Sequence, residues 1–482
     1  MNSAVVPQIT GVQTQTACIS ELFARQGETA IRLRTSTAAE RLAKIDRLKV
    51  AVLARAQALR EAGAEDFRKP PAEVDLAEIL PVVAEANEAR RKLKKWMRPQ
   101  RVRPTRAMFG TRGWIQYQPK GRCLIISPWN YPVNLTFGPL ISAIAAGNTA
   151  ILKPSELTPN LSRVMAELVR ETFPGDEIAL FEGDATVAQA LLELPFDHIF
   201  FTGSPAIGKQ VMTAAAKHLA SVTLELGGKS PTIIDAGADL DAAARNILWS
   251  KFTNDGQTCI APDHIYVHTS IKDAFVARCR EVLETTYGAE SPQQLQGPDL
   301  ARIVNARHTV RIKALLEDAR ARGARVLTGG FVDESQRFIA PTLLGDIPDD
   351  AAIMREEIFG PLLPIIGFSD IGEAIRRINA GPKPLALYLW SKDQAIVDRV
   401  LAQTSSGGAC INHTVVQFLH GNLPFGGVNN SGIGNAHGHW GFKAFSHERA
   451  VVRSQLMLAK MFYPPYTERM RWIVDKMIRF GV

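Results

Sequence analysis

The sequence has few cysteines, no long apolar run and no cluster of metal ligands. Its five cysteines, at positions 18, 123, 259, 279 and 410, are odd in number and scattered along 482 residues. Disulfide frameworks and zinc sites both need paired or clustered cysteines, so we expect reduced thiols, a cytoplasmic location and no metal. No apolar stretch is long enough to span a bilayer, and residues 1–20 lack the pattern of a secretion signal. The sequence therefore predicts a soluble protein without a membrane span.

Acidic residues are absent from one strongly basic stretch. Residues 90–106 carry nine Arg and Lys side chains and no acid, and the whole chain has a net charge of +8. Such a stretch can bind nucleic acid or acidic lipid. It is also typical of a solvated helix end followed by a linker, and Pro99 and Pro104 interrupt this one. Because Trp96 is its only aromatic residue, we favour the solvated helix end and expect no nucleic-acid partner.

What the sequence does contain is an alternation of short apolar strands with helical stretches. Strands are predicted at 123–127, 149–153, 178–181, 198–202 and 221–225, with helices at 160–172 and 206–218 among them. This rhythm is typical of a parallel, doubly wound sheet. A second alternating block covers 231–412, with strands at 265–267, 363–366, 385–390 and 409–411 and helices at 271–286, 301–322 and 370–380. The sequence therefore predicts an α/β chain with two sheet domains that meet near Gly227-Gly228.

The part of the chain before the first strand is predicted to be mostly helical. Residues 1–35 are polar and weakly periodic, and we interpret them as an arm. Apolar residues recur at helical spacing from Leu42 to Leu59, and Gly63 is expected to end that helix. A second helix is expected over 75–96, with Pro81 kinking it or opening its longer part. Residues 113–117 and those from 121 onward are predicted to be extended.

The most informative stretch is Phe252-Thr253-Asn254-Asp255-Gly256-Gln257-Thr258-Cys259-Ile260. A glycine and small polar residues let the backbone bend tightly just before Cys259, which can leave the thiol at the edge of a cleft. A thiolate is a strong nucleophile whose pKa depends on its surroundings. Taken alone, a cysteine is more often a buried structural residue than a catalytic one.

Six other short segments occur together with Cys259 and favour a catalytic over a structural cysteine. They are Ser127-Pro128-Trp129-Asn130, Lys153-Pro154-Ser155-Glu156, Phe201-Thr202-Gly203-Ser204, Glu225-Leu226-Gly227-Gly228-Lys229, Glu357-Ile358-Phe359-Gly360-Pro361 and Pro424-Phe425-Gly426-Gly427. In this order and spacing they resemble the aldehyde dehydrogenase superfamily over residues 42–453. Residues 131–136, 445–447 and 463–466 resemble its class 3 branch, which includes coniferyl aldehyde dehydrogenase-like enzymes.

The resemblance implies a Rossmann-type, doubly wound cofactor domain with a second α/β catalytic domain and a small oligomerisation element. The expected divisions are an N-terminal helical part (1–112), oligomerisation strands (113–122 with 440–460), the NAD(P)-binding domain (123–228), the catalytic domain (229–420), a bridging segment (421–460) and a helical tail (461–482). In related enzymes the oligomerisation segments pair across subunits, so a homodimer is expected.

The cofactor site is predicted from two kinds of evidence. Residues 202–208 follow a strand and open a helix, with Ser204 as a good N-cap, and a helix start suits phosphate. Glu156 follows a strand, where a carboxylate can accept the hydroxyls of a ribose. The resemblance places Lys153 and Glu156 on the adenosine ribose and Glu357 on the nicotinamide ribose with Phe359 nearby. It also places Ser127, Trp129, Gly203, Ser204 and Gly208 around the cofactor. NAD is favoured and NADP stays open.

The chemistry is predicted to run through Cys259, Asn130 and Glu225. Cys259 would attack an aldehyde and then hold the acyl product as a thioester. The Asn130 side-chain amide and the backbone N–H of Cys259 would form an oxyanion hole. By resemblance, Glu225 is the general base that activates water for thioester hydrolysis, and Lys229 is structural. Cys123, Cys279 and Cys410 are expected to be inert, and His413 and His420 to be ordinary loop residues.

The sequence leaves alternatives open. A CoA-acylating enzyme would release the thioester to a thiol and generally lacks the glutamate base, which is present here. A catalytically inactive relative would lack Cys259, Asn130 or Glu225. The tail over 463–482 has an apolar face (Met470, Ile473, Val474, Met477 and Ile478) ringed by basic residues. It suits dimer packing, contact with a membrane surface or a cap over the substrate mouth.

Overall fold

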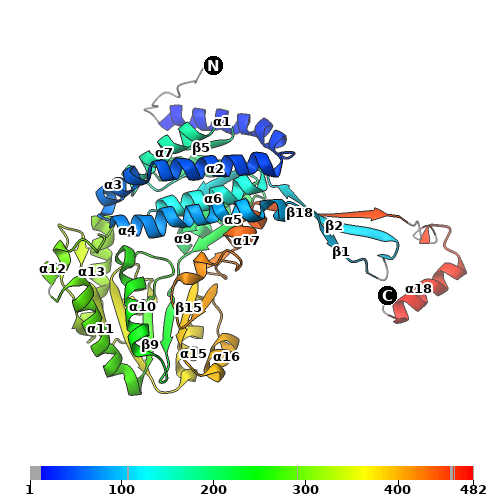
Figure 1. Cartoon of the computed structure of the whole chain (residues 1–482). Coiled ribbons are helices and arrows are strands. Elements are labelled where there is room, and N and C mark those ends of the chain that lie inside the picture. Colours follow the sequence, from blue (N-terminus) through cyan, green and yellow to red (C-terminus); the bar gives the residue numbers. More distant parts are fainter. Residues whose placement is uncertain (1–11, 106–107, 290, 456–459, 461, 481–482) are drawn as a thin grey trace.

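The computed structural model describes residues 12–105, 108–289, 291–455, 460 and 462–480. Two sheets, each carrying helices, form the body, and a long three-stranded arm projects from it (Figure 1). Among the described residues, no helix is both long and apolar enough to cross a membrane. The predicted fold class is confirmed.

The cofactor sheet has six strands in the order β17-β7-β6-β3-β4-β5. Five of them are parallel, and β17 runs antiparallel to β7. Their bounds are β3 (Arg122–Ile126), β4 (Thr149–Lys153), β5 (Ile178–Leu180), β6 (His198–Gly203), β7 (Ser221–Leu226) and β17 (Gly432–Ile433). The strand order reverses between β3 and β6, and ligands of doubly wound sheets bind at the carboxyl end of such a switch point.

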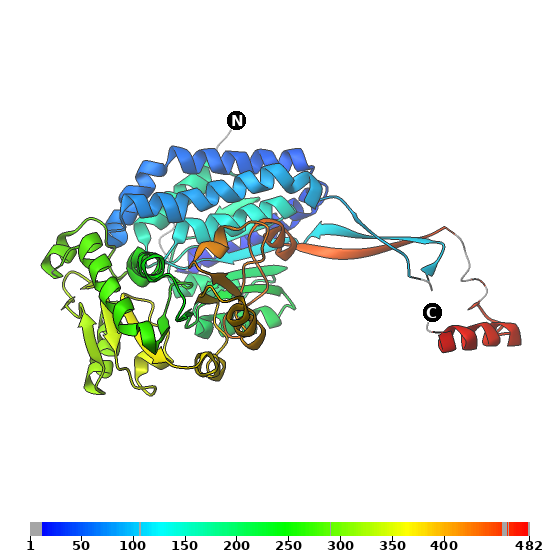
Figure 2. The ribbon, with the colours of Figure 1, turned by 60° about the horizontal axis from the view of Figure 1, so that its bottom comes forward.

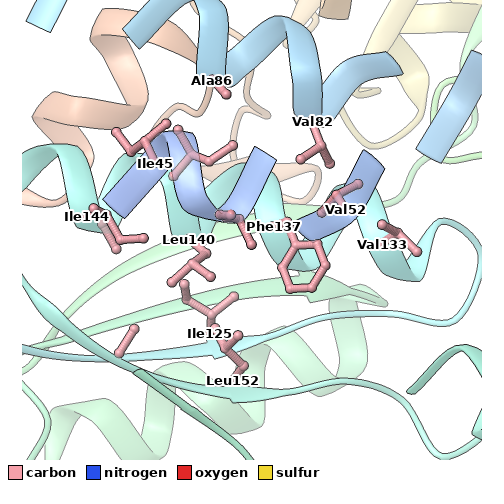
Figure 3. Packing of buried hydrophobic residues seen from close by; sticks show 14 of the residues in the cluster. Ile45, Val52, Val82, Ala86, Ile125, Val133, Phe137, Leu140, Ile144 and Leu152 are labelled. Carbon is pink, nitrogen blue, oxygen red and sulfur yellow. The ribbon is translucent and has the colours of Figure 1, made fainter. Parts of the chain in front are cut away.

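Alternate residues of the central strands enter two different cores. Ile125 of β3 and Leu152 of β4 lie in one core with α2 (Ala38–Ala54), α5 (Leu80–Trp96) and α6 (Pro132–Ala146), as Figure 3 shows. Leu124 and Ile151, one residue away in each strand, pack on the opposite face with α1 (Val12–Leu33), α8 (Ala185–Leu192) and α9 (Pro205–Ala216). Because successive strand residues point to opposite faces, continuous apolar strands predict this two-sided burial. The helix α7 (Pro159–Thr172) also belongs to this domain.

The interpretation of residues 1–35 as an arm was wrong. Within the described part, α1 is a helix of 22 residues, and Ile19 and Phe23 belong to the buried core of the cofactor sheet. The guanidinium of Arg122 lies 3.9 Å from the centre of the Phe23 ring. Polar residues interrupt its buried face, since Gln26 and Thr29 are buried between Phe23 and Ala30, and this obscured the helical periodicity in the sequence.

Gly63 does not end a helix as predicted. It lies inside α3 (Ala56–Phe67), where it is buried. A Cβ atom at this position would lie 3.1 Å from a methyl carbon of Val74, so the glycine allows close packing of two segments. The chain leaves α3 at Arg68, whose backbone is left-handed with φ 50°.

The helix predicted over 75–96 is interrupted at its start. A short α4 (Pro71–Val74) is followed by a π-helical turn over Asp75–Ile79 and then by α5, with Pro81 in the first turn of α5. Of the two roles predicted for Pro81, a kink or the opening of the longer part, the structure shows the second. A π turn adds one residue to a helical turn and often marks a functional site.

The catalytic sheet has seven strands in the order β10-β13-β14-β9-β8-β15-β16, of which only β10 is antiparallel to its neighbour. The bounds are β8 (Pro231–Ile234), β9 (His264–His268), β10 (Arg325–Thr328), β13 (Thr342–Gly345), β14 (Leu362–Phe368), β15 (Ala386–Trp390) and β16 (Gly408–Ile411). Its helices are α10 (Leu240–Phe252), α11 (Lys272–Tyr287), α12 (Ser291–Gln296), α13 (Ala306–Ala321), α14 (Ala352–Arg355), α15 (Ile371–Ala380) and α16 (Gln394–Gln403). A small pair, β11 (Val332–Asp333) and β12 (Phe338–Ile339), lies apart from the sheet order.

The arm is a three-stranded antiparallel sheet of β1 (Gln100–Val102), β2 (Thr111–Pro119) and β18 (Ser446–Ser454). The strands β2 and β18 pair along their whole length, from Thr111 with Ser454 to Pro119 with Ser446. The two segments that were expected to serve oligomerisation, 113–122 and 440–460, thus pair with each other within one chain. The helix α17 (Gly438–Ala444) lies at the base of the arm, and α18 (Glu468–Phe480) lies beyond its far end, away from the body (Figure 2).

Candidate active site

The loop that carries Cys259 is held in an unusual backbone conformation. Asn254, Asp255 and Gly256 all have positive φ, at 53°, 55° and 75°. A Cβ atom on Gly256 would lie 2.3 Å from the carbonyl oxygen of Gly360, so this position requires glycine. The backbone N–H of Asn254 donates to Oε2 of Glu73 at 2.8 Å. Non-glycine residues with positive φ cost free energy and are typical of functional loops.

Cys259 and Glu225 line one cavity of about 480 Å³, called here the substrate cavity. Glu225 lies near the end of β7 in the cofactor sheet, and Cys259 follows α10 in the catalytic domain. Most of the other lining side chains are apolar: Leu76, Leu80, Tyr131, Leu135, Pro139, Trp249, Ile260, Phe418, Leu419 and Phe425. Leu76, Leu80, Trp249 and Leu419 are exposed and form the mouth of the cavity. The cavity thus brings a thiol and a carboxylate together at the junction of the two domains.

Glu225 is buried, with 6% of its surface exposed, and neither carboxylate oxygen has a hydrogen-bond partner. Burial raises the pKa of Glu225 well above its ordinary value. Because an unpartnered buried carboxylate is a stronger base than one in water, this side chain suits proton abstraction.

The Cys259 thiol is also perturbed. Burial, with the nearby carboxyls of Glu357 and Glu225, raises the pKa of Cys259 to about 12. The backbone N–H groups of Cys259 and Ile260 oppose this by donating towards the sulfur, which lowers the pKa. The thiol therefore has to lose its proton when it attacks a substrate.

Asn130 lies directly behind this loop. It follows β3, is 3% exposed, and its side-chain amide donates to the carbonyl of Gln257 at 2.9 Å. An amide group carries two N–H donors, so the second can serve a substrate oxygen. The Tyr131 hydroxyl lies 2.6 Å from Oγ1 of Thr258, which ties the same segment to the residue before Cys259.

The residues predicted for the adenosine side follow β3 and β4. The Lys153 ammonium is buried, donates to the carbonyl of Pro154 at 2.7 Å and lies 3.9 Å from Oε2 of Glu156. Burial lowers the pKa of Lys153. The hydroxyl of Ser127 lies 2.5 Å from that of Thr136, so its side chain faces the protein interior. The carboxylate of Glu156 is half-exposed.

The predicted phosphate side lies at the start of α9. Ser204 caps this helix, and its hydroxyl accepts the N–H of Ile207 at 3.4 Å. A Cβ atom on Gly208 would lie 2.6 Å from Leu226, so this glycine lets α9 pack closely on β7. A Cβ atom on Gly203 would lie 2.5 Å from the ring of Phe201. The open helix start can accept a phosphate.

Glu357 and Phe359 lie between the domains. A Cβ atom on Gly227 would lie 2.2 Å from the Glu357 carboxylate, so only glycine leaves room for that carboxylate. Oε1 of Glu357 has no hydrogen-bond partner. Burial raises the pKa of Glu357 to about 8, although a hydrogen bond from the backbone N–H of Gly228 acts to lower it. The Phe359 ring meets the Trp129 ring edge to face at 5.3 Å.

Sequence reasoning missed the residues that hold the 357–359 loop. The Arg311 guanidinium donates to the carbonyls of Glu357 at 3.2 Å and Ile358 at 2.6 Å. The Lys229 ammonium bonds to Asp263 and donates to the carbonyls of Ile353 and Glu356, in keeping with the structural role expected for it. The ring of His308 lies 5.2 Å from that of Trp129. These residues lie far from the loop in sequence, and no local motif signals them.

The arrangement fits a dinucleotide. An open helix start, a buried lysine and a carboxylate after a strand lie at the carboxyl edge of the cofactor sheet, and the Glu357 carboxylate, which has an orphan oxygen, approaches that edge at Gly227. Groups of three or more metal-ligating side chains are absent from the described residues. Cys123, Cys279 and Cys410 are buried free thiols, and the ring of His413 hydrogen-bonds its own loop at Thr414.

A doubly wound sheet beside a cavity with a thiol and an orphan carboxylate is typical of dinucleotide-dependent oxidoreductases. Comparison with known proteins narrows this class to a single family. The chain belongs to the aldehyde dehydrogenase family, whose model matches residues 6–451. It is an enzyme of that family, and it resembles class 3 and coniferyl aldehyde dehydrogenases.

Individual relatives cover nearly the whole chain. A Pseudomonas aeruginosa protein named "Probable coniferyl aldehyde dehydrogenase" is 40% identical over 95% of this chain and 96% of its own length. Human aldehyde dehydrogenase family 3 member B1 is 42% identical over 90% and 92%. The solved structure of substrate-bound Staphylococcus aureus AldH is 41% identical, with a TM-score of 0.90 over 95% of this chain and 99% of that one. More distant solved structures include one complexed with NAD+ and one described as NADP dependent.

Proposed function

We propose that this enzyme oxidises hydrophobic aldehydes, aliphatic or aromatic, to carboxylates with NAD(P), through a thioester on Cys259. The observation that supports this most directly is the shared cavity of Cys259 and Glu225, in which the carboxylate has no hydrogen-bond partner. The mostly apolar lining favours an apolar substrate.

The chemistry follows from the residues. The Cys259 sulfur bonds to the aldehyde carbon after losing its proton, and the oxygen becomes an oxyanion. The Asn130 amide and the Cys259 backbone N–H stabilise that charge, at about 3 kcal/mol per donor. Loss of hydride from this carbon leaves a thioester. Glu225 then removes a proton from water, the hydroxide adds to the thioester carbon, and the carboxylate leaves as the carbon–sulfur bond breaks.

The nicotinamide cofactor, when bound, accepts the hydride. Lys153 and Glu156 would hold its adenosine ribose, the start of α9 at Ser204 its phosphates, and Glu357 its nicotinamide ribose. Ser127, Trp129, Gly203, Gly208 and Phe359 would complete the surroundings. The half-exposed Glu156 favours the free 2′-hydroxyl of NAD but can swing away from a 2′-phosphate, so NAD is proposed with NADP as a second cofactor.

A CoA-acylating reaction is the second candidate. It would pass the acyl group from Cys259 to a thiol, and no water-activating base would be needed. A buried, unpartnered carboxylate such as Glu225 is costly to keep. Its presence in the cavity therefore supports hydrolysis.

We also propose a cytoplasmic homodimer. In the described part of the chain, the outer edges of β1 and β18 have no strand partner, and exposed strand edges are usually covered. The arm extends well beyond the body (Figure 1), where a second subunit can reach it. The five cysteines are all free, as expected in a reducing compartment.

The test is a panel of aliphatic and aromatic aldehydes, read by NADH or NADPH absorbance with and without CoA. We expect turnover without CoA and kcat/KM that rises with apolar size. Activity only in the presence of CoA would contradict hydrolysis. Preference for small polar aldehydes would contradict the proposed substrate class.

A further inference from the structure

A fully buried ion pair lies directly behind the oxyanion side of the active site. The ammonium of Lys69 and the carboxylate of Glu78 are 2.8 Å apart, and both side chains are 0% exposed. Lys69 follows α3, and Glu78 lies in the π-helical turn before α5. Because two charges lose their hydration in such a site, a buried pair is weak evidence for stability and needs another explanation.

The donors of Lys69 are directed at the Asn130 segment. Its Nζ donates to the Asn130 carbonyl at 3.0 Å and lies 4.1 Å from the centre of the Tyr131 ring. The hydroxyl of Tyr131 in turn meets Thr258, the neighbour of Cys259. One ammonium therefore restrains the main chain that carries the oxyanion donor and a side chain that contacts the nucleophile loop.

Glu78 fixes the same segment from its other end. Its Oε2 accepts the N–H groups of Val133 at 3.0 Å and Asn134 at 3.1 Å, in the first turn of α6. Those N–H groups have no partner within the helix, so a carboxylate there caps it and suits its dipole. Asn130 lies just before this turn. The pair thus holds the carbonyl of Asn130 itself and the helix start that follows it.

We propose that Lys69 and Glu78 are positioning residues, which fix the Asn130 amide opposite Cys259 without touching the reacting atoms. This rests on the proposed role of Asn130 in the oxyanion hole. An ammonium with two oxygen acceptors and an aromatic face has few free directions, so the geometry is tightly determined. Small displacements of catalytic groups cost large factors in rate.

The main variant is the double replacement Lys69→Met with Glu78→Gln. It removes both charges while Met fills the space and the Gln carbonyl can still accept from α6. We expect kcat and the rate of the NADH burst to fall about 10- to 100-fold, with the NAD dissociation constant unchanged. Full kcat with only a lower melting temperature would show a structural role and overturn the proposal.

Lys44→Met with Glu177→Gln is the matched control. That pair is also largely buried, with Nζ and Oε2 2.6 Å apart, but it lies between α2 and the segment before β5. It is expected to lower the melting temperature and leave kcat intact. An equal loss of kcat in this control would mean that any damaged buried pair slows the enzyme, and would overturn the proposal.

A double-mutant cycle with Asn130→Ala locates the effect. If the pair acts through Asn130, adding Lys69→Met and Glu78→Gln to Asn130→Ala will reduce kcat by less than twofold more. A further loss as large as in the wild-type background would overturn the proposal. If Asn130→Ala alone keeps full kcat, Asn130 has no role in an oxyanion hole, and the positioning proposal is overturned as well. If Asn130→Ala is slow and the pair variant is not, only the positioning proposal falls.

Discussion

Replacing Glu225 by Gln separates the two halves of the proposed reaction. Hydride loss from the Cys259 adduct precedes hydrolysis, so the variant is expected to release a stoichiometric burst of NADH. Steady-state turnover should then fall by about 10²- to 10⁴-fold, equivalent to about 3–5 kcal/mol of barrier. The structure favours the upper part of this range. Both oxygens of Glu225 lack partners, and burial raises its pKa with no opposing cation, so the lost base is a strong one.

The pH dependence has a definite sign. The base acts only when ionised, so kcat of the wild type should rise with pH along an acid limb displaced above that of an ordinary carboxyl. Over that window the folded protein binds a proton that the unfolded chain has lost, so the free energy of unfolding falls as pH rises. Gln carries no charge. The variant should therefore be more stable than the wild type, by a margin that grows towards alkaline pH.

Rapid-mixing absorbance at about 340 nm, where NADH absorbs, measures the burst, and the burst amplitude is compared with the active-site concentration. Thermal unfolding at several pH values measures the difference in stability between the variant and the wild type. NAD binding, followed by fluorescence, is the control for folding of the cofactor site. If the burst disappears together with turnover, Glu225 acts earlier, as the acceptor of the Cys259 proton, whose high pKa requires one. That result would refute a role confined to hydrolysis.

Four further predictions follow from the site and the arm. Cys259→Ala should abolish oxidation while NAD binding, measured by fluorescence titration, stays nearly intact; substantial turnover of the purified variant would exclude a covalent mechanism. Gly227→Ala should raise KM for NAD by about tenfold or more, because the new methyl group displaces the Glu357 carboxylate. Gly237→Ala, whose added carbon meets nothing closer than 3.9 Å, is its control, and equal KM values would contradict the role of Glu357. Sedimentation at micromolar concentration should show a dimer, and a monomer would refute the proposed role of the arm. Deleting residues 462–482 should raise KM for long or aromatic aldehydes more than for acetaldehyde. Only a bulky substrate would reach α18 if this helix lies over the mouth of the substrate cavity of a second subunit. Equal changes in KM for all aldehydes would leave α18 without a substrate role.

Local patterns predicted the sheets well because their strands are short apolar runs bounded by turns. The strand predicted at 149–153 is β4 with the same bounds, and the strand predicted at 198–202 is β6 with one residue added. The strand β8 was missed, since Pro231 opens it directly after the Gly227-Gly228 turn. The helix predicted from 301 begins at Ala306 instead. The preceding residues are held in an extended path by tertiary contacts, such as the Val304 N–H that donates to the Gln257 side chain at 2.9 Å.

The residues of the site also fall into two groups: those that a local motif predicts and those that only the fold brings together. Cys259 and Glu225 stand in recognisable motifs, and the structure brings them to one cavity. Lys69 and Glu78 carry no motif, and their contacts reach residues more than fifty positions away. A lysine before two prolines reads as a surface residue in any sequence window. Its burial is a property of how α3, the π turn and α6 meet, which only the fold determines.

Several energetically unfavourable features of the structure lie around the predicted active site. Asp255 and Phe359 have left-handed backbones that ordinary side chains avoid, and Glu225 and Glu357 keep buried oxygens without donors. Each feature costs about 1–3 kcal/mol, a large share of the 5–15 kcal/mol by which domains are stable. Packing alone would remove them, since an apolar residue in place of Glu225 would fill the same space at no such cost. Water or substrate in the cavity can supply the hydrogen-bond donors that these carboxylate oxygens lack. The free energy lost by burying Glu225 without a partner is therefore an argument that its carboxylate takes part in the reaction.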